Sequence, residues 1–313
     1  MAIFSLNEVR TEQIKNIAND NFESWPESAT YGYFAGGIAP TLSPFRICTI
    51  NRIDFSSETT SLPGNDLPSE RSAGTATQSS SYGYFHGGYD GSNQLATIDR
   101  IDFSSETIST PGSFPVGRNS LAAVSGGASY RINGSRTYGY FGGGFGPGPF
   151  VCTIDRLDFS NETTSAPGNG LPQARRYLAA TSSNFYGYFA GGSAPPDVCT
   201  IHRLDFSNEI TSVLGTGLPA ANPQLAACSS SSYGYFGGGY TGFRTCTINR
   251  LDFSNETIST PGTGLSQARN GFAATQSSSY GYFAGGAYPY VCTIDRIDFS
   301  NETVSTPFGA GNG

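Results

Sequence analysis

The feature that most constrains this chain is a sequence repeat. The string Tyr-Gly-Tyr-Phe occurs six times, each time followed by one small residue or His and then by a Gly pair. The copies begin at Tyr31, Tyr82, Tyr138, Tyr186, Tyr233 and Tyr280. A second string, represented by residues 153–163 (TIDRLDFSNET), follows every copy of the first. Such regular spacing indicates one supersecondary unit used six times.

Each unit has the pattern of short β-strands. Residues 97–103 (TIDRIDF) alternate between two faces with a period of two, and β-branched and aromatic residues fill the stretch. A third string, represented by residues 171–181 (LPQARRYLAAT), occurs only five times. Its small residues suit a strand close to the axis of a ring. Four strands in about 47 residues, six times over, predict an all-β, six-bladed β-propeller over residues 29–313. A linear solenoid is the alternative, but it would need polar end units, and the last unit is as regular as the others.

The repeat resembles the Kelch repeat over about residues 29 to 308. The motif YGYFxGG is similar to the Kelch strand that ends in a Gly pair, and LPxAR is similar to the stretch before the innermost Kelch strand. The late Kelch Trp is missing from every copy, and the only Trp of the chain, Trp25, lies outside the repeats. More narrowly, YGYFGGG followed by DRIDFSNET resembles repeat proteins among the virion structural proteins of tailed marine phages, cyanophages especially. That resemblance implies a phage virion structural protein, assembled in the host cytoplasm, from the tail fibre or a surface appendage.

The N-terminal segment, residues 1–28, differs from the repeats and is expected to form a separate arm. Ser5 and Glu8 match a capping box, which predicts a helix over about residues 6–19. The apolar residues of this helix, Leu6, Val9, Ile14 and Ile17, lie on or beside one stripe. The arm either packs on its own propeller or docks the propeller onto another virion protein or onto a second copy of the chain.

The unit count leaves one strand unassigned. The six units contain five LPxAR elements, so one blade needs an inner strand from elsewhere. Propellers usually close by joining the first and last strands of the chain in one blade. We therefore expect residues before Tyr31, over about residues 20–28, to supply the missing strand.

Charge and cysteine usage exclude several functions. The chain has 17 basic and 24 acidic residues, for a net charge of −7, which disfavours non-specific binding to nucleic acid. The sequence contains no run of about 18 apolar residues, so no membrane-spanning helix is predicted. Five of six Cys occupy one repeat position, too far apart for disulfides, and are expected to be small buried hydrophobic residues. Since no zinc-ligand spacing and no phosphate loop occurs, neither a metal nor another cofactor is expected.

Repeated charges are expected to serve the scaffold. Arg52 and its five counterparts are each followed two residues later by Asp, on the same face of a strand. This spacing favours a ladder of ion pairs that fixes the blade register. The only two histidines, His86 and His202, break the repeat at different positions, so a shared catalytic role is not expected.

The most variable segment of each unit lies between the Gly pair and the following Thr-Ile strand. These loops carry eight aromatic residues, which are candidates for binding a host surface glycan or protein: Phe45, Tyr89, Phe145, Phe150, Tyr240, Phe243, Tyr288 and Tyr290. Aromatic residues on rigid loops offer a large contact area at low entropic cost. The alternatives are that these rings fold back over neighbouring blades, or that the propeller carries a polysaccharide-degrading enzyme. We expect a non-enzymatic protein, with the insertion at residues 125–137 as a second contact candidate.

Overall fold

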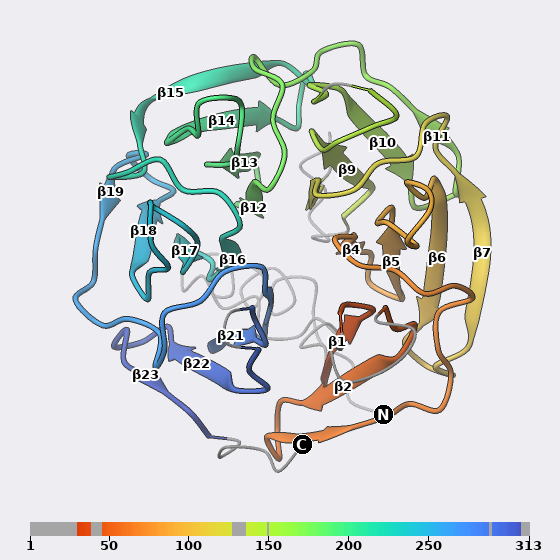
Figure 1. Ribbon diagram of the computed structural model, residues 1–313, viewed down its shortest axis with the longest axis horizontal. Helices are drawn as coiled ribbons and strands as arrows, with labels where there is room; N and C mark the ends of the chain where they lie inside the picture. The colour runs from red at the N-terminus through yellow and green to blue at the C-terminus, as the bar shows by residue number, and fades with distance from the viewer. Residues whose placement is uncertain (1–29, 39–45, 127–135, 149, 288–289, 308–313) are drawn as a thin grey trace, which may run out of the picture.

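The computed structural model describes residues 30–38, 46–126, 136–148, 150–287 and 290–307. In these ranges the chain forms 23 β-strands and no helix. The strands build six antiparallel sheets that stand around a central axis as the blades of a closed propeller (Figure 1). The predicted all-β, six-bladed propeller is confirmed, and the open solenoid is excluded.

The blades follow one another along the chain. The first blade contains β1 (Tyr31–Ala35), β2 (Ile50–Asp54) and β3 (Thr59–Ser61), and the second contains β4 (Thr75–Gln78), β5 (Tyr82–His86), β6 (Thr97–Asp102) and β7 (Ile108–Ser113). The third contains β8 (Ala122–Gly126), β9 (Tyr138–Gly142), β10 (Ile154–Asp158) and β11 (Thr164–Ser165), and the fourth contains β12 (Ala179–Ser182), β13 (Tyr186–Ala190), β14 (Thr200–Asp205) and β15 (Thr211–Gly217). The fifth contains β16 (Ala226–Ser229), β17 (Tyr233–Gly237), β18 (Ile248–Asp252) and β19 (Ile258–Ser259), and the sixth contains β20 (Ala273–Gln276), β21 (Tyr280–Ala284), β22 (Ile294–Asp298) and β23 (Val304–Ser305).

Five inner strands surround the axis, namely β4, β8, β12, β16 and β20. They come from the third string, which reads Leu-Ala-Ala at β8, β12 and β16, Phe-Ala-Ala at β20 and Gly-Thr-Ala at β4. Small side chains suit this place because blades crowd together near the axis. Each Tyr-Gly-Tyr-Phe strand comes next, and the outermost strand ends the sheet. The first blade has three strands in the described part of the chain. The predicted helix at 6–19 and the predicted closing strand at 20–28 lie outside the described residues.

The same contacts join each blade to the next. The second Tyr of each YGYF strand stacks on the Phe of the following blade's DFS turn, with ring centroids 5.0–5.7 Å apart, and its hydroxyl donates a hydrogen bond to the Glu of that turn. Stacked pairs of this kind contribute roughly 0.5–1.5 kcal/mol each beyond buried area. Because Tyr282 stacks on Phe55 in the same way, the sixth blade meets the first and the ring is closed.

The repeated arginines also connect blades, which corrects one expectation. Each forms an ion pair with the turn Glu of the next blade, with N–O distances of 2.5–2.9 Å: Arg52–Glu106, Arg100–Glu162, Arg156–Glu209, Arg203–Glu256, Arg250–Glu302 and Arg296–Glu58. The Asp two residues after the Arg was the expected partner. It instead accepts hydrogen bonds from its own turn, as when the Oδ1 atom of Asp102 accepts from the backbone and hydroxyl of Ser104.

The turn Glu has an unusual backbone. All six copies, from Glu58 to Glu302, have positive φ values of 51–58°. This left-handed conformation is costly for a residue with a side chain. Many β-hairpins close with a turn that is followed by one left-handed residue, and the Glu takes that left-handed place here. The ion pair with the preceding blade compensates for part of that cost.

A second set of arginines, in the LPxAR connectors, was missed by the sequence analysis. Arg71, Arg118 and Arg269 are almost fully buried and pair with Asp99, Asp155 and Asp295 of the same blades. Each also donates to backbone carbonyls beside the YGYF strand. A sequence signal for these pairs was available. The residue between Ile and Arg in the TIxR strand is Asp in these three units, and this Asp is the partner of the connector arginine.

Candidate recognition surface

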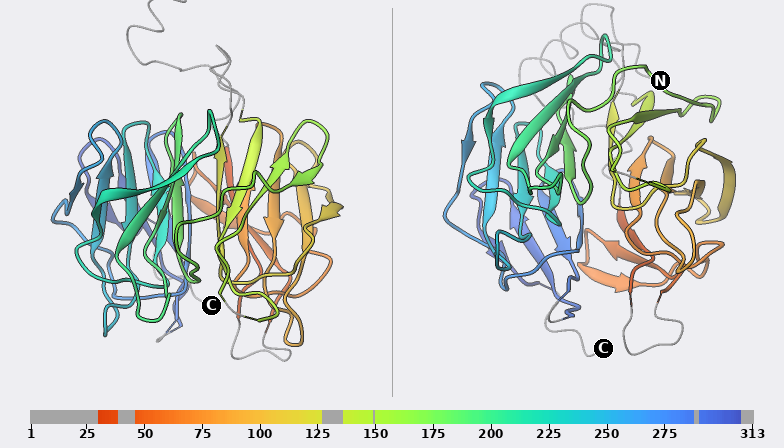
Figure 2. Two further views of the ribbon diagram at one scale, coloured as in Figure 1. Left: turned by 90° about the horizontal axis from the view of Figure 1, so that it is seen from above. Right: turned by 45° about the horizontal axis from the view of Figure 1, so that its top comes forward.

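Two kinds of chain segment meet at one end of the disc, which we call the loop face. They are the variable loops after each Gly pair and the connectors that lead to the inner strands. Isolated bridges join them, for example between Ser72 and Tyr89 and between Arg176 and Ser193. The DFS turns and the hairpins before each YGYF strand lie at the opposite end, because neighbouring strands of each blade are antiparallel. Figure 2 shows the blades edge-on.

Three of the eight candidate aromatic residues fold back onto the propeller. The ring of Tyr89 lies 4.8 Å from the guanidinium of Arg46, and its hydroxyl donates to the carbonyl of Gly91. Phe145 and Phe150 pack edge to face, 6.0 Å apart, and the guanidinium of Arg176 lies over both. These three rings are half-buried, so they mainly stabilise their own loops.

Three other candidates project from adjacent blades. Tyr240 and Phe243 of the fifth blade are 39% and 72% exposed, and Tyr290 of the sixth blade is 46% exposed. The remaining two, Phe45 and Tyr288, lie outside the described residues. The structure therefore brings the exposed aromatic candidates to one sector of the loop face.

The fifth-blade loop, residues 240–244, is held at its base by a residue that breaks the repeat. Asn222 occupies the position of the buried connector arginines. Its Nδ2 donates to the carbonyl of Gly238 at 2.8 Å, and its Oδ1 accepts from the backbone of Tyr240 at 2.7 Å. At the tip, the backbone of Thr241 donates to the carbonyl of Phe243. Phe243 is thus presented to solvent by a short loop with several backbone restraints.

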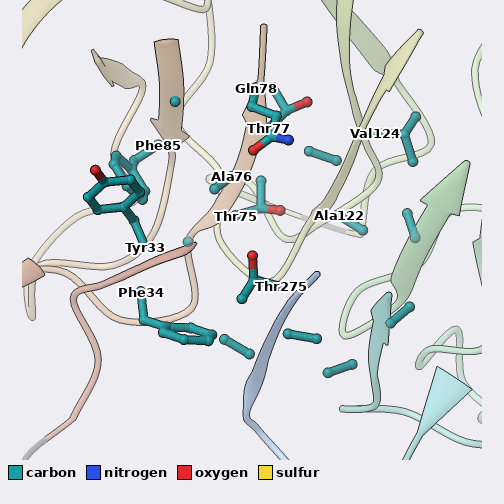
Figure 3. A pocket seen from close by; sticks show the side chains of 18 of the residues that line it. Tyr33, Phe34, Thr75, Ala76, Thr77, Gln78, Phe85, Ala122, Val124 and Thr275 are labelled. Atoms are coloured by element: carbon teal, nitrogen blue, oxygen red, sulfur yellow. The ribbon is translucent and has the colours of Figure 1, made fainter. Parts of the chain in front are cut away.

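A central cavity of about 350 Å³ lies between the inner strands (Figure 3). Its lining combines small and polar side chains of the inner strands, such as Ala122, Thr75 and Gln78, with aromatic rings such as Phe34 and Phe85. Its described lining contains no Asp or Glu. Over the described part of the chain, no group of three or more His, Cys, Asp or Glu is placed to bind a metal ion.

The two histidines are buried in different blades. His86 is fully buried between the rings of Phe114 and Phe141, and burial with the nearby Arg118 lowers its pKa to about 3. The Nε2 of His202 lies 2.8 Å from the Nη2 of Arg175, in the place that Asp takes in three other blades. Burial and Arg175 lower the pKa of His202 to about 3. Both rings are therefore neutral at pH 7.

The cysteines correct another expectation. Of the five at the shared repeat position, Cys152, Cys246 and Cys292 are exposed, whereas Cys48 and Cys199 are half-buried. Only Cys228, on the inner strand β16, is buried. None of the six forms a disulfide. The shared position lies just before the Thr-Ile strand, at the edge of the loop face. The side chains there lie outside the buried core.

Comparison with known proteins gives no match, either to a protein-family profile or to a curated protein. In the described ranges, no helical segment has the length and hydrophobicity of a membrane span.

Proposed function

We propose that this chain is a non-enzymatic recognition protein of a phage virion, in a tail fibre or surface appendage. Its propeller would bind a host surface glycan or protein through the loop face. The observation that carries the proposal is the set of three exposed aromatic rings, Tyr240, Phe243 and Tyr290, on adjacent blades. The virion assignment is supported by the resemblance of the YGYFGGG and DRIDFSNET motifs to virion repeat proteins.

The chemistry of these rings suits shape-based contact. An exposed aromatic ring that becomes buried on binding is a common source of interface energy, often about 2 kcal/mol or more per residue. Both sugars and protein side chains can stack on such rings. Several copies in one particle would raise the overall avidity without new contacts.

The N-terminal arm is proposed as the attachment to the particle. Leu6, Val9, Ile14 and Ile17 would form the apolar stripe that contacts another virion protein or a second copy of this chain. A chain lacking residues 1–18 should keep the propeller fold, measured by circular dichroism, and fail to enter particles. Normal incorporation of that variant would contradict an anchoring role.

The recognition proposal is tested on a glycan array and on host cells with a variant and a matched control. Phe243→Ala removes the most exposed ring among the described residues of the loop face and should weaken binding by at least about tenfold, which corresponds to about 1.4 kcal/mol. Phe185→Ala is the control, because Phe185 is also exposed, at 56%, but lies in a hairpin on the opposite face. Equal binding by wild type and Phe243→Ala would contradict the proposed surface.

A further inference from the structure

In the described part of the chain, the first blade has no strand on the inner side of β1. In the sixth blade, the inner strand β20 pairs with β21 from Ala273↔Ala284 to Gln276↔Gly281, and the other complete blades repeat this register. The corresponding edge of β1 has no partner strand in the described part of the chain. Phe34 is accordingly only half-buried, whereas its five counterparts are buried. We call the space along this edge the first-blade slot.

At the blade next to the slot, the described residues do not supply a contact that the other five seams have. A Cβ atom added to Gly139 would lie within 2.8 Å of Thr77, on the inner strand of the preceding blade. The same holds for Gly32, Gly187, Gly234 and Gly281, with Thr275, Val124, Thr181 and Cys228 respectively. At Gly83 the nearest such atoms belong to Ile101 and Phe103 of its own blade. No inner strand of the described residues therefore places a side chain over Gly83.

The described residues contain no connector to this position either. In five blades the second Gly of the pair donates its N–H to the carbonyl of the next connector's Arg or Asn, as Gly239 does to Arg269. The described residues offer no such acceptor to Gly286. Asn51 is exposed, although Asp99, His202, Asn249 and Asp295 at the same repeat position are buried. The slot is thus shaped for a connector residue followed by a strand.

We propose that residues 19–26 of the same chain fill the first-blade slot. They directly precede β1 and repeat the connector pattern of Arg or Asn followed three residues later by Leu or Phe. This pattern occurs as Arg118/Leu121, Arg175/Leu178, Asn222/Leu225, Arg269/Phe272 and, in the N-terminal segment, Asn19/Phe22. From Phe22 to Tyr31 is one residue more than from Phe272 to Tyr280, so the hairpin is one residue longer.

Charge supports the assignment of Asn19. Where the strand residue is Asp, the connector residue is Arg, as in Arg269 and Asp295. In the fifth blade both are neutral, Asn222 and Asn249. The first blade has the neutral Asn51, and Asn19 with Asn51 would match the fifth-blade combination.

The register also suits Trp25 and Pro26. In the fifth blade, the N–H of Ser230 donates to the carbonyl of Tyr233. In an antiparallel pair every second residue makes the backbone hydrogen bonds to the neighbouring strand. In β16 these residues are therefore Cys228 and Ala226. Pro26 takes the place of Ser229, whose N–H is not used in the ladder, so a proline is tolerated. Trp25 takes the place of Cys228 and would cover Gly83, where the cavity lined by Gly83, Phe85 and Phe103 has room for a large ring. The arm before Asn19 then leaves the ring on the loop face.

The single tryptophan makes the proposal measurable in the full chain. Trp25 should emit as a buried indole and be quenched by acrylamide several-fold less than in the denatured chain. Two proline variants test the strand register. Glu23→Pro removes an N–H due to donate to Ala35, and should expose Trp25 and lower the Tm. Ser24→Pro, the matched control, changes an N–H outside the ladder and should do much less.

The outcomes separate clearly. Circular dichroism reports whether the complete blades stay folded in each variant. A Trp25 that is solvent-exposed in the folded wild-type chain overturns the proposal and leaves the slot to a strand from another molecule. Equal effects of Glu23→Pro and Ser24→Pro also overturn it. Neither result depends on binding to a host surface.

Discussion

Replacing Arg269 by Asn is expected to be strongly destabilising unless Asp295 is replaced with it. Arg269 and Asp295 are 1% and 0% exposed, and their closest N–O distance is 2.6 Å. The guanidinium also donates to the carbonyls of Phe283 and Thr293. Burial lowers the pKa of Arg269, so the charged pair is held against a desolvation cost.

The magnitude follows from what each variant leaves behind. Arg269→Asn leaves the carboxylate of Asp295 buried, with the backbone N–H of Ser266 as its remaining hydrogen-bond donor. Removing one partner of a buried pair typically costs about 3–5 kcal/mol. The double variant Arg269→Asn/Asp295→Asn copies the natural fifth-blade combination of Asn222 and Asn249 and should recover most of that loss.

Urea denaturation monitored by circular dichroism measures both free energies of unfolding. The expected order is wild type, then the double variant within about 2 kcal/mol, then the single variant. The reasoning is refuted if the single variant costs less than about 1 kcal/mol. It is also refuted if the double variant is as unstable as the single one, because the charge would then not be the cause.

Two further predictions concern the scaffold. Glu162→Ala should destabilise more than Glu162→Gly, by about 1 kcal/mol in thermal unfolding, because both lose the pair with Arg100 but only Gly relaxes the positive φ; the reverse order would contradict this. His86 and His202 have folded-state pKa values below the unfolded value of 6.5, so the unfolded chain binds more protons. Stability should fall as the pH drops from about 6.5 towards 3, by up to about 1.4 kcal/mol per pH unit for each histidine. His202→Asp should reduce this slope in urea titrations, since Arg175 then has the Asp partner seen in other blades; an unchanged slope would count against it.

The periodic part of the sequence predicted the periodic part of the fold. Six copies of YGYF, with small residues in the third string, were enough to predict six blades and the identity of the inner strands. The partners of Arg52 and its counterparts could not be predicted, because the Glu that each one meets comes from the next blade. The spacing of residues along one strand shows only which of them share a face of that strand. It therefore suggested Asp54 as the partner of Arg52.

The candidate surface was predicted less completely. Variation among copies located the loop face, but it could not separate Phe243 from Phe145. That difference depends on neighbours from other segments, since Arg176 covers Phe145 and no such cation is seen over Phe243 in the described contacts. Asn222 was also missed, although its departure from the LPxAR pattern was visible in the sequence.

The most direct test of the account is an exchange of loops between blades. The fifth-blade loop 240–244 and the fourth-blade loop 193–197 have the same length, and each is closed by a bridge between its first and last residues. Writing the fourth-blade sequence SAPPD into positions 240–244 should leave the Tm nearly unchanged and abolish binding to the glycan or cell surface that the wild type recognises. Undiminished binding by this folded variant would contradict the claim that the exposed loops of the fifth and sixth blades carry recognition.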